Sequence, residues 1–191
     1  DSKYIADVSG LIDSQVFAVG LGTAQELNPA ALYDICNGHD GYLLLTDALD
    51  NDDTFKLAKY FLQIQAGVNN EDIVVDPDGY VASGDKVVVP FRLSEADISV
   101  DAIVLMPFQG VLEVAVVTPA GDVIDASNVA SFPTVAKSDS SHMTYYRMTL
   151  PVDDGLSVHA QEGEWQLVLT VDKRVLKRYL STLDNYPGLI E

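Results

Sequence analysis

Acidic side chains are the residues of this sequence whose spacing comes nearest to a known chemistry. Asp76-Pro77-Asp78-Gly79 begins like a calcium-binding loop, in which carboxylates at alternate positions bind the ion. The pattern then stops, because Tyr80 follows and Val87 occupies the position at which such a loop needs a glutamate. An ordinary acidic turn accounts for the same residues. We therefore predict no metal site, and name Asp76 and Asp78 as candidate ligands.

No set of residues has the spacing of a catalytic site. The histidines are isolated from one another and from any cysteine pair, unlike zinc ligands: His39, His142 and His159. No serine has the glycine neighbours of a nucleophile elbow. The paired carboxylates Glu162 and Glu164 lie in a predicted hairpin turn, where acidic residues are ordinary exposed surface. We predict that the chain is not an enzyme.

Two glycines after an uncharged run raise the question of a nucleotide site. Gly20 and Gly22 fit the first two positions of a dinucleotide-binding loop. Gln25 occupies the third, where glycine is needed for the helix to pack closely on the strand. We predict no bound cofactor in this chain. The single cysteine, Cys36, falls at an apolar helical position and is predicted to be a buried, unreactive thiol.

These glycines belong to a strand-helix-strand-helix pattern. The uncharged run at 16–22 predicts a strand buried on both faces of a parallel sheet. Asn28-Pro29 then supplies an N-cap and a proline at the first helical position. The remaining predicted elements are a helix end at Asn37-Gly38, a strand at 42–46, and a helix at about 54–66, with Phe61 on its apolar side, after the acidic capping run 50–53.

This first part of the sequence resembles the end of a von Willebrand factor A (VWA) domain. The resemblance lies in Val16-Phe17-Ala18-Val19-Gly20-Leu21-Gly22, in the helix around Leu32-Tyr33-Asp34-Ile35-Cys36, and in Gly38-His39-Asp40-Gly41 before Tyr42-Leu43-Leu44-Leu45. It covers residues 1–68, about the last third of such a domain. The resemblance implies part of a doubly wound α/β sheet that binds a protein or matrix ligand. It also implies that the chain is a fragment of a longer parent.

Members of that family often bind a divalent cation through an Asp-x-Ser-x-Ser motif. Asp7-Val8-Ser9-Gly10-Leu11 copies the first two ligands, but Leu11 stands where the last serine belongs. The motif is also too close to the glycine-ended strand for the family arrangement. The resemblance therefore implies that this chain lacks the metal-ion-dependent adhesion motif, and that Mg²⁺ or Ca²⁺ binding is a property of the full-length parent.

Composition limits the classes of partner. The 191 residues include 11 Lys and Arg against 29 Asp and Glu, a net charge of -18, which disfavours nucleic acid and anionic membranes. Hydrophobic residues make up 48% of the chain, enough for a real core. No run approaches the ~18 apolar residues that a membrane helix needs. We expect no membrane insertion, and leave the compartment open with a secreted or cell-surface setting favoured.

Residues 69–173 are predicted to form an antiparallel β-sandwich, which makes the fold class α/β plus all-β. Short alternating segments are separated by Gly, Pro and Asp turns. The predicted strands are 73–75, 86–92, 102–106, 111–118, 143–150 and 165–171, and 128–141 is predicted to be an exposed loop. The cadence is similar to sandwich modules that accompany adhesion-type domains. Residues 174–191 form a basic C-terminal tail, for which one or two helical turns are predicted.

We interpret the chain as a non-catalytic, adhesion-type protein-binding module. Two alternatives stay open: a structural or assembly subunit, and an accessory sandwich that grips a carbohydrate or peptide for an enzyme. Exposed aromatic residues along one sandwich face, such as Tyr145 and Tyr146, would favour the last. The strand at 16–22 has only one neighbour within the predicted pattern, and an uncovered apolar edge favours association. We therefore expect self-association, a rearranged N-terminal segment, or pairing with the missing N-terminal part of the domain.

Overall fold

The computed structural model describes residues 10–23, 25–46, 57–82, 84–106, 110–155 and 161–183, with the backbone alone at 179, 182 and 183. The chain divides into two compact units, 1–73 and 74–191. The division falls five residues after the predicted boundary at 68, and each unit is described by itself.

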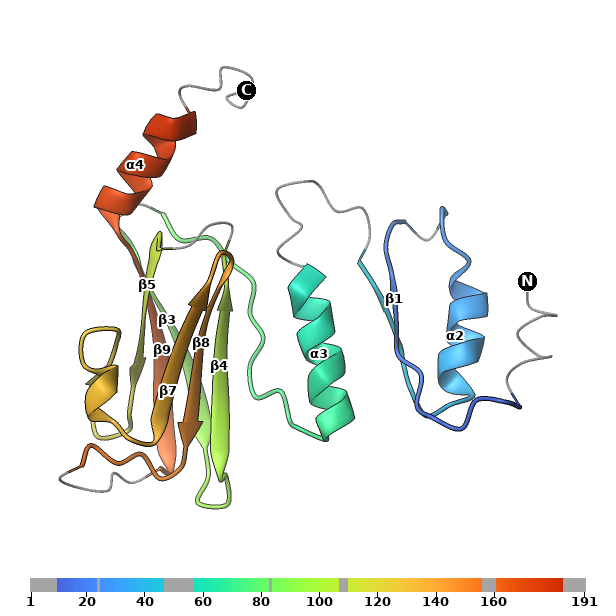
Figure 1. Ribbon diagram of the computed structural model, residues 1–191, viewed down its shortest axis with the longest axis horizontal. Coiled ribbons are helices and arrows are strands. Elements are labelled where there is room, and N and C mark those ends of the chain that lie inside the picture. Colours follow the sequence, from blue (N-terminus) through green and yellow to red (C-terminus); the bar gives the residue numbers. More distant parts are fainter. Residues whose placement is uncertain are drawn as a thin grey trace. The chain divides into compact units, whose positions relative to one another are not determined.

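The first unit is a strand-helix-strand-helix segment. Its elements are β1 (Ala18–Gly20), α2 (Pro29–Asn37), β2 (Leu43–Leu45) and α3 (Leu57–Asn69). The two strands pair in parallel, with Ala18 opposite Leu43 and Gly20 opposite Leu45. Figure 1 shows α2 and α3 on either side of this pair. The mixed α/β character is therefore as predicted, although the described residues of this unit contain only two strands.

Local chemistry explains where α2 begins and where the chain turns into β2. The Asn28 side chain accepts a hydrogen bond of 3.2 Å from the Ala31 amide, and Pro29 opens the helix, as predicted. A Cβ atom on Gly41 would lie 1.7 Å from the Val16 carbonyl oxygen, so only glycine fits there. Tyr42 packs edge-on against Phe17 at 4.9 Å and donates a hydrogen bond of 2.8 Å to the Gln63 carbonyl of α3.

The core of the first unit is thin. Ala31, Cys36 and Thr46 are buried, and α3 contributes no buried residue. The prediction that the strand at 16–22 is buried on both faces is wrong, because Ala18 and Val19 are only half-buried and Leu21 is 56% exposed. In β2, Leu45 is 41% exposed. Phe61, predicted on the apolar side of its helix, is 57% exposed. A two-stranded sheet has too little surface to cover both helices.

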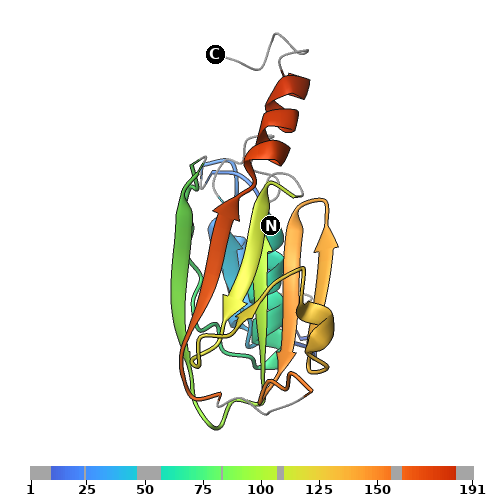
Figure 2. The same cartoon turned by 90° about the vertical axis from the view of Figure 1, so that its left-hand side faces the viewer.

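The second unit is an antiparallel β-sandwich followed by a helix. Its strands are β3 (Lys86–Leu93), β4 (Ser99–Leu105), β5 (Leu112–Val117), β6 (Val123–Ile124), β7 (Val135–Ser140), β8 (Met143–Thr149) and β9 (Gly163–Val171). One sheet has the order β3-β9-β5-β6 and the other β4-β8-β7. Figure 2 shows β3, β9 and β5 side by side in the first sheet. Helix α4 (Lys173–Leu183) continues from β9.

Alternate residues of both sheets fill one core. Trp165 is fully buried and stacks on Phe91 with ring centroids 6.3 Å apart, while its Nε1 donates to the Gln161 carbonyl oxygen at 2.8 Å. Tyr146 and Met148 of β8 are also fully buried in this cluster. Alternate residues of β9, namely Trp165, Leu167 and Leu169, lie on the core side of the sheet.

Two predictions for residues 69–173 are wrong, and one strand was missed. Residues 73–75 form no strand and are 51%, 52% and 44% exposed, because no strand lies beside them to pair with among the described residues. Residues 128–141 are not an exposed loop: they contain a 3-10 turn, η2 (Val129–Ser131), and all of β7. The short strand β6 was not predicted. The first part of the predicted tail is helical, and 184–191 lie outside the described residues.

Candidate functional site

In open parallel sheets, ligands bind beyond the carboxyl ends of the strands. In the first unit this edge is closely packed around Gly20. A Cβ atom there would lie 2.8 Å from Leu45 Cδ2 and 2.9 Å from Leu27 Cδ1. The buried Thr46 donates its amide to the Gly20 carbonyl oxygen at 3.0 Å. The backbone after β1 is therefore held in place by β2 and by the start of α2.

A carboxylate is fixed beside this edge. Glu26 Oε2 accepts hydrogen bonds from the Thr23 amide at 3.0 Å and from its hydroxyl at 2.9 Å. These bonds, the backbone one foremost, lower the pKa of Glu26. Gly22 has φ +118°, a conformation that favours glycine, and a Cβ atom there would lie 3.2 Å from Glu26 Oε2. This geometry presents one ordered negative charge and no nucleophile.

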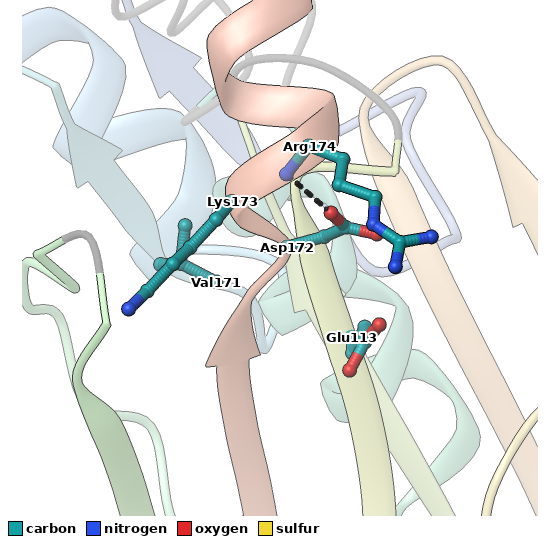
Figure 3. Close-up of a pocket in the computed structure, with 5 residues that line it drawn as sticks. All are labelled: Glu113, Val171, Asp172, Lys173 and Arg174. Carbon is teal, nitrogen blue, oxygen red and sulfur yellow. Dashed lines mark hydrogen bonds between the residues drawn. The ribbon is translucent and has the colours of Figure 1, made fainter.

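The sandwich has a second candidate, an open hollow of about 410 Å³ where β5, β9 and α4 meet. Its lining is mostly charged: Glu113, Val171, Asp172, Lys173 and Arg174. In Figure 3 the Arg174 side chain lies over Glu113, whereas Lys173 points to the other side. Asp172 Oδ1 accepts from the amides of Arg174 at 2.7 Å and Val175 at 3.1 Å, and these two backbone bonds lower the pKa of Asp172. Asp172 is thus the N-cap of α4, and its carboxylate is used in folding.

The predicted metal candidates are not brought together. Asp76 and Asp78 are both exposed, in a segment without regular secondary structure. Among the residues that the structure describes, no group of three or more His, Cys, Asp or Glu side chains could hold a metal ion. Asp7, Ser9, the acidic run 50–53 and His159 lie outside the described residues.

Tyr145 and Tyr146 do not form an exposed aromatic face. Being adjacent in β8, they point to opposite faces of the sheet. Tyr146 is fully buried, whereas Tyr145 is half-buried on the outer face beside Arg147, whose guanidinium carbon lies 5.8 Å from the ring centroid. Arg147 in turn donates two hydrogen bonds, of 3.0 and 2.8 Å, to the Asp101 carboxylate. The observation that would have favoured a carbohydrate-gripping sandwich is therefore not made.

Cys36 is buried, as predicted, and burial raises the pKa of its thiol. His39 lies three residues after Cys36, and its Nε2 atom is buried without a hydrogen-bond partner among the described residues. The His39 amide donates to the Cys36 carbonyl oxygen at 3.0 Å, so the two residues belong to one turn. No third ligand-type side chain joins them in the described part of the chain, and the turn carries no metal site.

Two ordered polar side chains escaped the sequence analysis. Glu26 could have been found from Thr23-Ala24-Gln25-Glu26, whose Thr-x-x-Glu spacing is that of a capping box. Gln161 had no such signal. Its Nε2 atom donates to the carbonyl oxygens of Ser94, Glu95 and Asp97 at 3.2, 2.6 and 2.9 Å, contacts that exist only once the sandwich has folded.

Comparison with known proteins adds no relative. No protein family matches the sequence, and no curated protein or solved structure matches it significantly. None of the helices in the described ranges is long and apolar enough to span a membrane.

Proposed function

We propose that the chain is a non-catalytic, adhesion-type protein-binding module, in which residues 1–68 are the C-terminal part of a VWA-type domain and the sandwich supports or extends it. The observation that carries this proposal is that β1 and β2 pair in parallel and that α2 connects them. Short parallel pairs normally belong to larger sheets covered on both faces.

The edge of β1 supports a binding role. The Ala18 amide donates to the Tyr42 carbonyl oxygen and the Gly20 carbonyl oxygen accepts from Thr46, so the amide and carbonyl of Val19 point away from β2. In the described part of the chain, no strand pairs with that side of β1. A strand from a protein ligand, a second copy or the missing part of the domain would complete the sheet there.

The charge of the chain supports a protein partner over nucleic acid. We place the module in a secreted or cell-surface protein, and we assign divalent-cation binding to the full-length parent. Both proposals rest on the resemblance. An assembly role is the second candidate, and the apolar sheet face described below favours it. We propose no enzymatic activity.

Binding of the full chain to immobilised matrix proteins tests the first proposal. We expect saturable binding that persists in EDTA, because the chain lacks the complete ion motif. Leu21→Asp, at a residue 56% exposed directly after β1, should abolish it. Leu11→Asp, at a residue 83% exposed in the same unit, is the matched control and should bind normally. Binding unaffected by Leu21→Asp, or lost in EDTA, would contradict the proposal.

A further inference from the structure

The outer face of the β3-β9-β5-β6 sheet carries two apolar rows. Residues that alternate with the core set point to this face. The strand register places Val88, Val168 and Ala115 in one row, and Pro90, Gln166 and Val117 in the next. Only Gln166 among these six is polar. The first row crosses three adjacent strands without a polar residue, and Gln166 at the centre of the second row is the single polar residue between them.

This face is accessible at its sides and crowded at its centre. Val88 of β3 is 41% exposed. Val123 of β6, which pairs with Val117 of β5, is 47% exposed. Val168 is only 8% exposed because neighbours on both adjacent strands flank it. A contiguous apolar strip with a polar border is typical of a protein interaction site.

The charged residues bordering the strip are arranged asymmetrically. One further row lies next to the row of Val88. It consists of Lys86 on β3, Thr170 on β9 and Glu113 on β5. Arg92, also on β3, lies in the row next to that of Pro90 and faces Glu164 across the strands. All four charged residues are exposed. Lys86 and Arg92 thus make the β3 side of the face basic. Glu113 is the acidic residue of the β5 side, and Arg174 of α4 lies beside it (Figure 3).

We propose that this face binds the same face of a second copy of the chain, with a two-fold axis that runs along β9. Such an axis keeps each row opposite itself and exchanges β3 with β5. Lys86 then lies opposite Glu113 of the second copy, and Val168 opposite Val168. An axis across the strands would instead place Lys86 over Arg92, which like charge disfavours. The same axis sets Glu164 of β9 opposite Glu164 of the second copy, which is one like-charge pair against two Lys86–Glu113 pairs. The balance of charges therefore still favours a second copy in this orientation.

The size of the face determines the strength of the dimer. Four rows across three to four strands span roughly 15 by 20 Å, so two such faces bury less than the roughly 1,600 Å² of a standard interface. Each copy also carries a net charge of -18, which opposes association. At about 0.15 M salt this repulsion is screened beyond ~8 Å. We expect a weak, concentration-dependent dimer at physiological salt. This inference concerns the second unit and does not depend on the function proposed for the first.

Sedimentation velocity of the full chain over a wide range of concentration tests the proposal. We expect a monomer-dimer equilibrium that Lys86→Glu and Glu113→Lys each weaken by at least tenfold. The double variant should restore it, because it exchanges the two charges of each pair. Val88→Glu should also remove the dimer, whereas Ile98→Asp, at a residue 80% exposed outside this sheet, should leave it unchanged.

Two results would overturn the proposal. One is a monomer at every concentration while Trp165 fluorescence reports a folded sandwich. The other is a dimer that all of these variants leave intact, which would place the contact elsewhere, for example at the edge of β1. Because Val88, Lys86 and Glu113 are exposed, each variant is expected to fold, and thermal unfolding checks that it does.

Discussion

The hydroxyl of Tyr146 donates a hydrogen bond of 2.9 Å to the carbonyl oxygen of Val114, and this buried bond joins the two sheets of the sandwich. Val111 accepts from Asp172 after β9, so by alternation the Val114 carbonyl points to the other side of β5. There β6 pairs only with Val116 and Val117. The tyrosine therefore supplies the donor that a longer strand would have supplied.

Tyr146→Phe should lower the free energy of unfolding by about 1 to 2 kcal/mol, because it leaves a buried carbonyl without a donor. Urea unfolding followed by the fluorescence of Trp165, the only tryptophan, measures this loss. Tyr145→Phe is the matched control on the outer face and should cost less. Equal losses in the two variants would show that the buried bond adds nothing specific.

Alkaline pH should destabilise the sandwich through the same residue. Burial, helped by the charges of Asp125 and Asp139, raises the pKa of Tyr146 above its ordinary value. The neutral phenol is thus favoured in the folded state. Its contribution is fully present below the unfolded pKa of about 10 and is lost as pH rises above it. Unfolding free energies measured across that range should fall less steeply for Tyr146→Phe than for the native chain.

Gln161→Glu should weaken the link between the β3–β4 turn and the start of β9. The substitution replaces a donor facing three carbonyl oxygens by an acceptor, and we expect a loss of about 1 to 3 kcal/mol at neutral pH. Protonation of the introduced carboxyl restores a donor, so the loss should shrink as pH falls. Gln65→Glu, at an exposed residue of α3, is the control for added charge. A loss independent of pH would argue against the hydrogen bonds as the cause.

Gly41→Ala should unfold the first unit and leave the sandwich folded. The new methyl group would overlap the Val16 carbonyl oxygen, which backbone movement alone could relieve. Circular dichroism should lose helical signal from α2 and α3 while Trp165 stays buried. Gly10→Ala, where nothing lies within 4 Å, should change neither signal. Loss of the Trp165 signal in Gly41→Ala would instead mean that the sandwich depends on the first unit.

Local chemistry made part of this structure predictable. Asn28-Pro29 determines the start of α2 within a few residues, and the alternation around Trp165 identifies the core side of β9. Alternation of apolar and polar residues does not reveal β7, because Lys137 and Asp139 occupy inward positions of this edge strand. Conversely, the β-branched run at 73–75 looks like a strand but has no partner strand in the described part of the chain.

The site was less predictable than the fold. Contacts such as those of Tyr146 with Val114, and of Gln161 with Ser94, join residues 32 and 67 positions apart. They depend on which strands lie together, which no local pattern encodes. The apolar rows on the outer sheet face became visible only through the register of three strands.

The sandwich begins and ends side by side, since Lys86 at the start of β3 lies opposite Thr170 near the end of β9. Tension applied through the flanking chain would therefore load this pair first and open the sheet like a zipper, one hydrogen-bonded pair after another. While folded, such a module adds little to the end-to-end distance of the chain. It unfolds at low force, and unfolding then lengthens the chain by the extended length of about a hundred residues. Its mechanical behaviour would be that of an extensible spacer.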